Sequence, residues 1–407
     1  MKCRHCKSEL ELEFLDLGNA PPSNAYLHAE DLRKPEVTYP LRVLACTNCW
    51  LVQTEDYTDA DALFSADYAY FSSTSKGWLK HAADYCGMIT NRLKLDKNSF
   101  VVELASNDGY LLKNFVAAGV PCLGIEPTKS TAEAAKAIGI SVRQEFFGAS
   151  VGHRMEDAGE QADLVIGNNV YAHVPDINDF THGVAALLKP DGVVTFEFPH
   201  LMQLIAQTQF DTVYHEHFSY LSLCAVKSIF AVAGLRVFDV EELPTHGGSL
   251  RIYGCRVEAG HSETDAVKAI LQAEDRAGLQ DVATYTSFQT RANRVKDGLV
   301  QFLLNAKSEG KSVAGYGAAA KGNTLLNYAG IRPDLLPFVC DAADAKTGRY
   351  MPASHIPILH PSVLRDRRPD YLVILPWNIA PEVMKQNEDL AVQGSKFVVA
   401  VPEIKIC

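Results

Sequence analysis

The 407-residue sequence lacks several features that would assign it to a specialised class. It has no run of about 18 apolar residues, so we expect no membrane-spanning helix. Its opening stretch, MKCRHCKSEL, contains no apolar core of the kind that a secretory signal needs, and we expect a cytoplasmic protein. We find no low-complexity segment and no short-period repeat. The net charge of −11 argues against nucleic acid as a partner, although a local basic pocket for a phosphorylated ligand remains compatible with it.

The composition that is present, 47% hydrophobic and 21% charged, is that of an ordinary globular protein. The chain is too long for one hydrophobic core, so we expect two or three domains. Residues 1–62 carry two close cysteine pairs and few helical signals, which indicates a small metal-stapled module. Residues 63–240 and 241–407 alternate apolar strands with helices, a pattern typical of parallel sheets covered on both faces. The predicted fold class is therefore α/β, with two such domains behind the N-terminal module.

Apolar runs predict the individual elements of these two domains. The expected strands span residues 99–104, 121–126, 162–166, 192–196, 249–254, 312–316, 336–341, 371–375 and 397–401. Helices are expected at 109–118 and 132–138, and a long polar helical stretch at 262–307.

Ten cysteines are present, and four of them form two Cys-x-x-Cys pairs: Cys3 with Cys6, and Cys46 with Cys49. Two such chelating pairs can close a tetrahedral Zn–S₄ site. Because four protein ligands leave no open coordination position, this zinc is expected to be structural. An iron–sulfur centre and two unrelated reduced pairs are the alternatives.

A strand-to-helix turn follows the predicted strand 99–104, and parallel sheets bind ligands at such carboxyl ends. It lacks the Gly-x-Gly-x-x-Gly pattern of dinucleotide sites. Glu103 opens the turn, and the next strand ends in Glu126, where an acid can accept hydrogen bonds from a ribose diol. This suits an adenosyl ligand without a pyrophosphate, and an ordinary surface turn is the alternative. The third strand ends in Asn168, Asn169 and, further on, His173, which point to the same crevice or to a structural turn.

The densest group of titratable residues is Tyr214-His215-Glu216-His217. Histidine is the usual proton-transfer group near neutral pH, and a neighbouring carboxylate or tyrosine can orient its ring. The cluster therefore predicts acid–base chemistry. Metal ligation by His215 and His217 and a polar structural turn remain open.

A second turn, Gly315-x-Gly317-x-x-Ala320, also follows a predicted strand, and Asp341 ends the next one. This is a dinucleotide fingerprint and favours a rival hypothesis, a nicotinamide-dependent sugar-nucleotide oxidoreductase. Lys321 beside the turn also suits the phosphates of a sugar nucleotide. A degenerate domain that binds nothing is the third possibility.

Taken together, these motifs resemble those of bacterial sugar C-methyltransferases that add a methyl branch at C-3 of a TDP-linked 4-keto-deoxy sugar. The matching segments cover nearly the whole chain in order: the cysteine quartet, 102–109, 124–127, 169–174, 212–217, His246-Gly247-Gly248-Ser249 and 315–327. The resemblance implies a zinc-binding module, a central class I methyltransferase domain and a Rossmann-like C-terminal domain. It thus favours S-adenosylmethionine over NAD, and an enzyme of deoxysugar biosynthesis. The clustered acid–base residues count against a third hypothesis, a non-catalytic zinc scaffold that binds nucleotide sugars.

The resemblance also implies roles for individual residues. His217 matches the proposed base, with supporting polar groups at Tyr68, Tyr214, Glu216 and His173. The expected S-adenosylmethionine site comprises Glu103, Ala105, Ser106, Asn107, Asp108, Gly109, Glu126, Pro127, Asn168 and Asn169. Weaker candidates for the nucleotide sugar are His200, His215, Arg251 and Lys321, the last two by charge for its diphosphate. The enzyme is expected to act as a monomer or small homo-oligomer.

Overall fold

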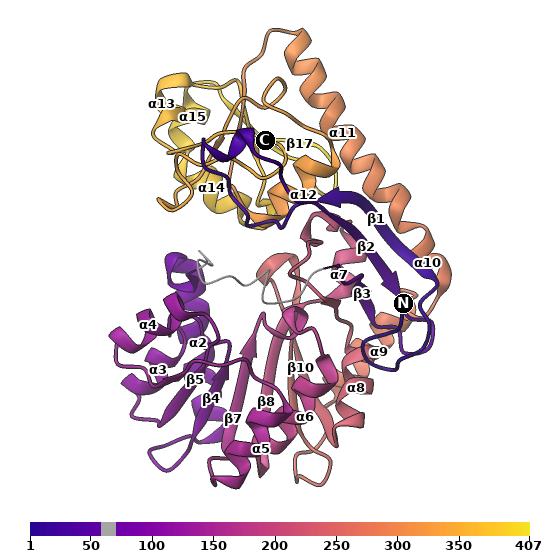
Figure 1. The fold of residues 1–407 in the computed structure, drawn as a ribbon, viewed down its shortest axis with the longest axis vertical. Helices are drawn as coiled ribbons and strands as arrows, with labels where there is room; N and C mark the ends of the chain where they lie inside the picture. Colours follow the sequence, from indigo (N-terminus) through magenta and orange to yellow (C-terminus); the bar gives the residue numbers. More distant parts are fainter. Residues whose placement is uncertain (58–70) are drawn as a thin grey trace.

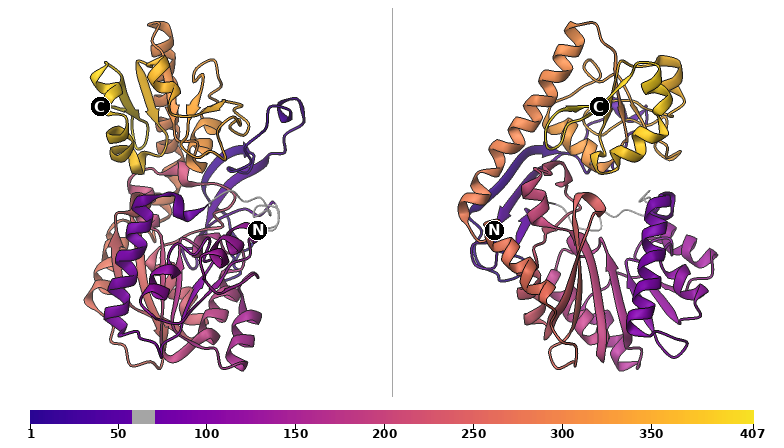
Figure 2. Two further views of the ribbon diagram at one scale, coloured as in Figure 1. Left: turned by 90° about the vertical axis from the view of Figure 1, so that its left-hand side faces the viewer. Right: turned by 180° about the vertical axis from the view of Figure 1, so that it is seen from behind.

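The computed structural model describes residues 1–57 and 71–407, so the expectation for Tyr68 lies outside the described residues. Two α/β bodies lie one above the other in Figure 1, and the N-terminal strands run beside the long helix α11 that joins the bodies. Figure 2 shows the same arrangement from the side and from behind. In the described part of the chain, no helix combines the length and the apolar content that crossing a membrane requires.

The central body is a seven-stranded sheet in the order β10-β11-β8-β7-β4-β5-β6. Its strands are β4 (Val101–Leu104), β5 (Cys122–Ile125), β6 (Val142–Arg143), β7 (Ala162–Asn168), β8 (Leu188–Pro199), β10 (Leu235–Leu243) and β11 (Ser249–Arg256). Strand β11 alone runs antiparallel, between β8 and β10. Because β11 lies inside this sheet, the central sheet runs on to Arg256, past the boundary expected at residue 240.

Helices cover both faces of the central sheet (Figure 1). They are α2 (Lys76–Leu93), α3 (Leu112–Ala117), α4 (Lys129–Ala137), α5 (Ala149–Asp157), α6 (Ile177–Leu187), α8 (Leu223–Val232) and α9 (Asp265–Arg276). This is why β4 consists of four buried residues with no polar alternation. Its carboxyl end, and those of β5 and β7, lie at the same edge of the sheet.

The N-terminal module forms a four-stranded antiparallel sheet, β1 (Leu12–Ala20), β2 (Tyr39–Ala45), β3 (Val52–Thr54) and β9 (Ser219–Tyr220). The fourth strand therefore comes from the central part of the chain. Phe14 of β1 stacks on Phe288 at a centroid distance of 4.5 Å and belongs to a core shared with the C-terminal body. The module thus completes its core by packing on the rest of the molecule.

The C-terminal body is a six-stranded sheet in the order β14-β13-β12-β15-β16-β17, parallel except for β17. Its elements are β12 (Val313–Tyr316), α12 (Ala320–Tyr328), β13 (Val339–Cys340), β14 (Ile358–Leu359), α13 (Val363–Arg367), β15 (Tyr371–Ile374), α14 (Ala380–Gln386), α15 (Glu388–Val392), β16 (Lys396–Val399) and β17 (Lys405–Ile406). Figure 1 places this body opposite the carboxyl edge of the central sheet.

The helical stretch expected at 262–307 is three helices, α9, α10 (Val282–Thr286) and α11 (Phe288–Ser308). Gly278 adopts a φ of +75°, which ends the first helix in a conformation that other residues avoid. Asp281 then caps α10 by accepting the amide of Ala283.

Candidate active site

The four paired cysteines converge in the N-terminal module. Their sulfur atoms all lie within 4.8 Å of one another, with 3.5 Å between Cys3 and Cys49 and between Cys6 and Cys46. Sulfurs bound to one tetrahedral zinc lie about 3.8 Å apart, given Zn–S bonds of about 2.3 Å. Both pairs are followed by a residue at positive φ, Lys7 and Trp50, so the two turns share one shape. The donor set fits structural zinc.

The turn after β4 is held by carboxylates that accept backbone amides. Glu126, at the end of β5, accepts the amides of Asn107 and Thr128, both at 2.9 Å. The turn is tight, with Ala105 and Asn107 at a φ of +50° and Gly109 at +76°. A Cβ at Gly109 would lie 2.9 Å from Ile140, so the position favours glycine in both conformation and space.

Within the described residues, several buried polar atoms around this turn and at the end of β7 have no hydrogen-bond partner. They are Glu103 Oε2, Ser106 Oγ, Asp108 Oδ1, both amide atoms of Asn168 and Asn169 Oδ1. Buried polar groups in proteins normally have partners, so this concentration fits a polar ligand such as an adenosyl group. Burial, followed by the charges of Glu126 and Asp108, raises the pKa of Glu103 well above its ordinary value. Pro127 is half-buried and follows Glu126 directly.

The acid–base cluster lies next to the loop that leaves β7. The rings of His173 and His217 have centroids 4.6 Å apart, and the ring of Tyr214 lies 4.0 Å from that of His217. Nδ1 of His217 donates to the carbonyl of Thr212 at 2.9 Å, because a carbonyl can only accept. His217 therefore keeps its lone pair on Nε2. The end of β7 and the loop after it thus carry both Asn168 and Asn169, which are expected to bind the cofactor, and the ring of His173.

Burial disfavours the charged form of both His173 and His217. Burial, then the neighbouring His173, lowers the pKa of His217 well below its usual range. Burial lowers the pKa of His173 to about 4. Nδ1 of His173 donates to the carbonyl of Glu216 at 2.7 Å, so its Nε2 carries a lone pair and cannot donate. In this tautomer His173 presents Nε2 as an acceptor, and its role as a supporting polar group stays a prediction.

Side chains of the N-terminal module form hydrogen bonds with the segment that carries this cluster. The buried carboxylate of Glu216 accepts from Ser23 Oγ at 3.1 Å and Asn24 Nδ2 at 3.2 Å, and Thr54 Oγ1 donates to the carbonyl of His217 at 3.1 Å. The ring of His215 packs edge-on against Tyr39 and contacts the Pro40 carbonyl at 3.2 Å. Glu216 and His215 thus fasten the segment to the module.

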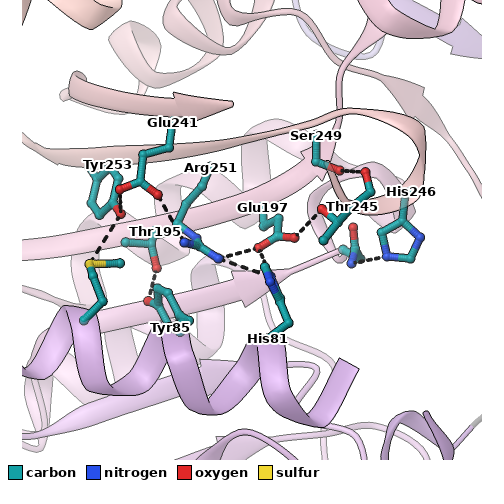
Figure 3. A network of polar contacts seen from close by, with 12 residues as sticks. His81, Tyr85, Thr195, Glu197, Glu241, Thr245, His246, Ser249, Arg251 and Tyr253 are labelled. Atoms are coloured by element: carbon teal, nitrogen blue, oxygen red, sulfur yellow. Dashed lines mark hydrogen bonds and ion pairs between the residues drawn. The ribbon is translucent and has the colours of Figure 1, made fainter. Parts of the chain in front are cut away.

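A second network lies on β8, β11 and α2 (Figure 3). Glu197, at the end of β8, binds His81 and Arg251, each at 2.8 Å, and accepts from Thr245 at 2.9 Å. Burial alone would raise the pKa of Glu197, but the hydrogen bond from His81 and the charge of Arg251 lower it. Arg251 also pairs with Glu241 at 3.2 Å, so its guanidinium already faces two carboxylates.

His200 lies in a separate buried pair. Its Nε2 is 2.7 Å from Glu274 of α9, which also accepts the amides of Leu223 and Cys224 at the start of α8. These contacts join helices, and none of them reaches the acid–base cluster.

Sequence reasoning assigned no role to His246, although the motif around it was noted. Its backbone has a φ of +54°, and its Nε2 lies 3.1 Å from Asn169 Nδ2 (Figure 3). Trp78 of α2 contacts it edge-on at 5.2 Å and stacks on His81 at 4.8 Å. The pair Gly247-Gly248 after His246 is the signal that indicates an unusual backbone at this point.

Lys321 stands in the first turn of α12 and faces the central body. Its Nζ donates to Asn378 Oδ1 at 2.6 Å and lies 4.5 Å over the ring of Trp377. Trp377 in turn donates to Asp211 at 2.7 Å. Burial lowers the pKa of Lys321, and Asp211 opposes this.

The glycine turn after β12, which the sequence marks as a dinucleotide fingerprint, is contacted by side chains of the protein itself. The carbonyl of Ala318 accepts from Tyr26 at 2.5 Å and from Lys346 at 2.9 Å. Asp341 accepts the amides of Ala318 and Ala343, both at 2.8 Å. The carbonyl of Ala318 and the carboxylate of Asp341 are therefore engaged within the chain.

Comparisons with known proteins agree along the chain. Three family models match, described as a zinc binding domain (residues 3–64), a methyltransferase domain (78–240) and a C-methyltransferase C-terminal domain (244–402).

The C-methyltransferase NovU of Streptomyces niveus is 34% identical over 405 residues, which covers 100% of this chain and 96% of NovU. An ubiquinone biosynthesis O-methyltransferase of Bartonella bacilliformis is 24% identical over 98 residues, covering 23% of this chain and 38% of that protein. A solved methyltransferase, ChlM of Synechocystis with bound SAM, aligns with 50% of this chain and 100% of its own at 12% identity, with a TM-score of 0.35.

Proposed function

This chain belongs to the C-methyltransferase family, and from that premise we propose that it methylates C-3 of a TDP-linked 4-keto-deoxy sugar. It is an S-adenosylmethionine-dependent enzyme with a zinc-binding module, so the oxidoreductase and scaffold alternatives fall away. We further propose that it works in the cytoplasm, in deoxysugar biosynthesis, as a monomer or small homo-oligomer.

The chemistry needs a carbon nucleophile. The C-4 ketone makes the proton on C-3 of the sugar removable, and we assign its removal to Nε2 of His217. Bound S-adenosylmethionine would supply an electrophilic methyl group, held by the turn after β4, Glu126 and the asparagines that end β7. Holding both reactants in one place is itself a large contribution to the rate.

The observation that carries this proposal is the state of His217. The ring is buried, and burial lowers its pKa. Its Nδ1 hydrogen is donated to the carbonyl of Thr212, which leaves the lone pair of the neutral ring on Nε2. A base prepared in this way beside the loop that carries Asn168 and Asn169 suits proton removal next to the methyl donor. Tyr214 is the candidate donor for the sugar oxygen, since its hydroxyl can donate a hydrogen bond.

The direct test is product analysis. The purified protein is incubated with S-adenosylmethionine and a small panel of TDP-4-keto sugars that differ at C-3 (amino, hydroxy or deoxy), and the products are analysed by mass spectrometry. We expect a gain of one methyl group on one member and a methyl signal at C-3 by NMR. If no member of the panel gains a methyl group on carbon, the proposed substrate class is wrong.

A further inference from the structure

The position of Lys321 is fixed relative to the acid–base cluster. One turn further along α12, Thr324 Oγ1 donates to the carbonyl of Val213, the residue before Tyr214, at 2.8 Å. Asn323 Nδ2 donates to the carbonyl of Ser23 at 2.5 Å. Both side chains are buried. Although Lys321 belongs to the C-terminal body, it is therefore held against the segment that carries the proposed base.

The ammonium of Lys321 has one hydrogen-bond acceptor among the described residues and no carboxylate partner there. That acceptor is the neutral amide of Asn378. Trp377, beneath it, is packed against Gly247 of the turn after His246, since a Cβ at Gly247 would lie 2.3 Å from the Trp377 ring. An ammonium has three donors, so this one keeps donors available for a ligand between the two bodies.

The charge of Lys321 acts on two neighbouring histidines, His217 and His246. It lowers the pKa of His217, in addition to the larger effects of burial, of His173 and of His246. After burial, it is also the largest influence lowering the pKa of His246, to about 4. A cation near a general base makes that base weaker, which opposes proton removal unless negative charge develops beside the cation as the proton leaves.

We propose that Lys321 supplies the positive charge that meets the C-4 oxygen of the sugar as it becomes an enolate. This inference rests on the proposed function. In the step, the C-3–H bond breaks and its proton goes to Nε2 of His217. The electron pair of that bond forms the C-3–C-4 double bond, and the π pair of the ketone moves to the oxygen beside Nζ. Among the described residues, burial lowers the pKa of His217 and His246, and Arg251 is paired with two glutamates. Lys321 is therefore the cation beside this part of the described chain that has no carboxylate partner. This role differs from diphosphate binding, which the sequence suggested for Lys321.

The test separates turnover from nucleotide affinity. Lys321→Met and Lys321→Gln remove the charge at similar length, Lys321→Arg keeps it, and Lys385→Met makes the same change at an exposed position of α14. Methyl transfer is measured with the sugar identified by the panel, and TDP affinity is measured by calorimetry. We expect the neutral variants to lose about 10²–10³-fold in kcat with TDP affinity within about twofold of wild type. Lys321→Arg should retain part of the rate, and Lys385→Met should match wild type.

A pH profile provides a readout that a structural role would not change. The groups that act on His217 are His173, His246 and Lys321, and removing the lysine charge raises the pKa of the base. The acidic limb of kcat/KM should therefore move to higher pH in Lys321→Met. Unchanged kcat, or lost TDP affinity with kcat retained, would overturn the proposal while leaving the proposed function intact. A wild-type protein that methylates no sugar of the panel would instead reject the proposed function, and this inference with it.

Discussion

At the scale of single residues, the site is defined by which hydrogens and lone pairs are already engaged. Two backbone carbonyls, those of Thr212 and Glu216, bind the Nδ1 hydrogens of His217 and His173. Each ring therefore presents Nε2 as an acceptor. The sequence identifies both rings as candidates, but their tautomers follow from contacts that no local pattern reveals.

Replacing His217 by alanine should abolish most of the methyl transfer. Removal of a general base typically costs on the order of 10²–10⁴-fold in rate, while the residues proposed to bind S-adenosylmethionine lie at the ends of β4, β5 and β7. Methyl-transfer assays and isothermal titration would show turnover lost and cofactor affinity kept. His153→Ala, at an exposed position of α5, is the control. Near-normal turnover of His217→Ala would exclude it as the base.

Glu103→Gln should stabilise the ligand-free protein and weaken cofactor binding. Because burial raises its pKa, Glu103 contributes stability that is present at low pH and lost as the pH rises through its folded-state pKa. The free energy of unfolding of the variant should thus exceed that of wild type at pH 8 by about 1 kcal/mol or more. This difference should shrink toward pH 5. Cofactor affinity should fall about tenfold or more.

Thermal unfolding across this pH range and calorimetric titration with S-adenosylhomocysteine would measure both effects. Glu133→Gln, at an exposed position of α4, provides the matched control. A variant that is less stable than wild type at pH 8 would contradict the argument that Glu103 is strained by burial.

At the scale of elements, apolar runs predict well the strands that are buried on both faces. Strands β4, β5, β12 and β15 lie within a residue or two of their expected bounds, because each is a short apolar run that ends in a turn. The division of the 262–307 stretch was not predicted, since its polar residues fit a helix throughout and only Gly278 indicates the break. The place of β11 in the central sheet depends on pairing with distant strands and has no local signal.

The zinc module should be needed for the active site as well as for its own fold. Cys49→Ser removes one of four ligands and should lower the zinc content, reduce the melting temperature by at least about 5 °C and abolish most of the methyl transfer. The physical reason is that Ser23, Asn24 and Thr54 support Glu216 and His217 from this module.

Elemental analysis, thermal unfolding and the methyl-transfer assay would be made on the same samples. Cys122→Ser, at a half-buried position of β5 outside the quartet, is the control. A zinc-free protein with normal turnover would show that the module does not support the base.

At the scale of the whole molecule, the two Rossmann-like bodies differ in how the polar groups at their strand-to-helix turns are paired. The turn of the central body is surrounded by buried polar atoms without partners, whereas that of the C-terminal body is engaged by Tyr26, Lys346 and its own amides. The sequence fingerprint at Gly315 and Gly317 predicts the local geometry correctly. It cannot reveal that Tyr26 contacts this turn, because Tyr26 lies 292 positions from Ala318 in the sequence.

Titration with NADH should therefore show no saturable binding at concentrations where S-adenosylhomocysteine saturates the protein. Fluorescence titration of NADH and calorimetry of S-adenosylhomocysteine would test this on the full chain. Tyr26→Phe, which removes the hydroxyl contact to Ala318, indicates whether the tyrosine itself is the barrier. Micromolar NADH binding by the unaltered protein would refute the interpretation that this turn is engaged internally.

The pairing of β3 with β9 has a consequence for biosynthesis on the ribosome. Thr54 leaves the exit tunnel long before its partner, the carbonyl of His217, which lies 163 positions later. The carbonyl of Ser23 is synthesised still earlier relative to its partner Asn323, which lies 300 positions later. Contacts this distant form slowly, because long loops must close first. The contacts that join α12 to Ser23 and to the carbonyl of Val213, beside the proposed base, therefore form only after α12 has left the exit tunnel.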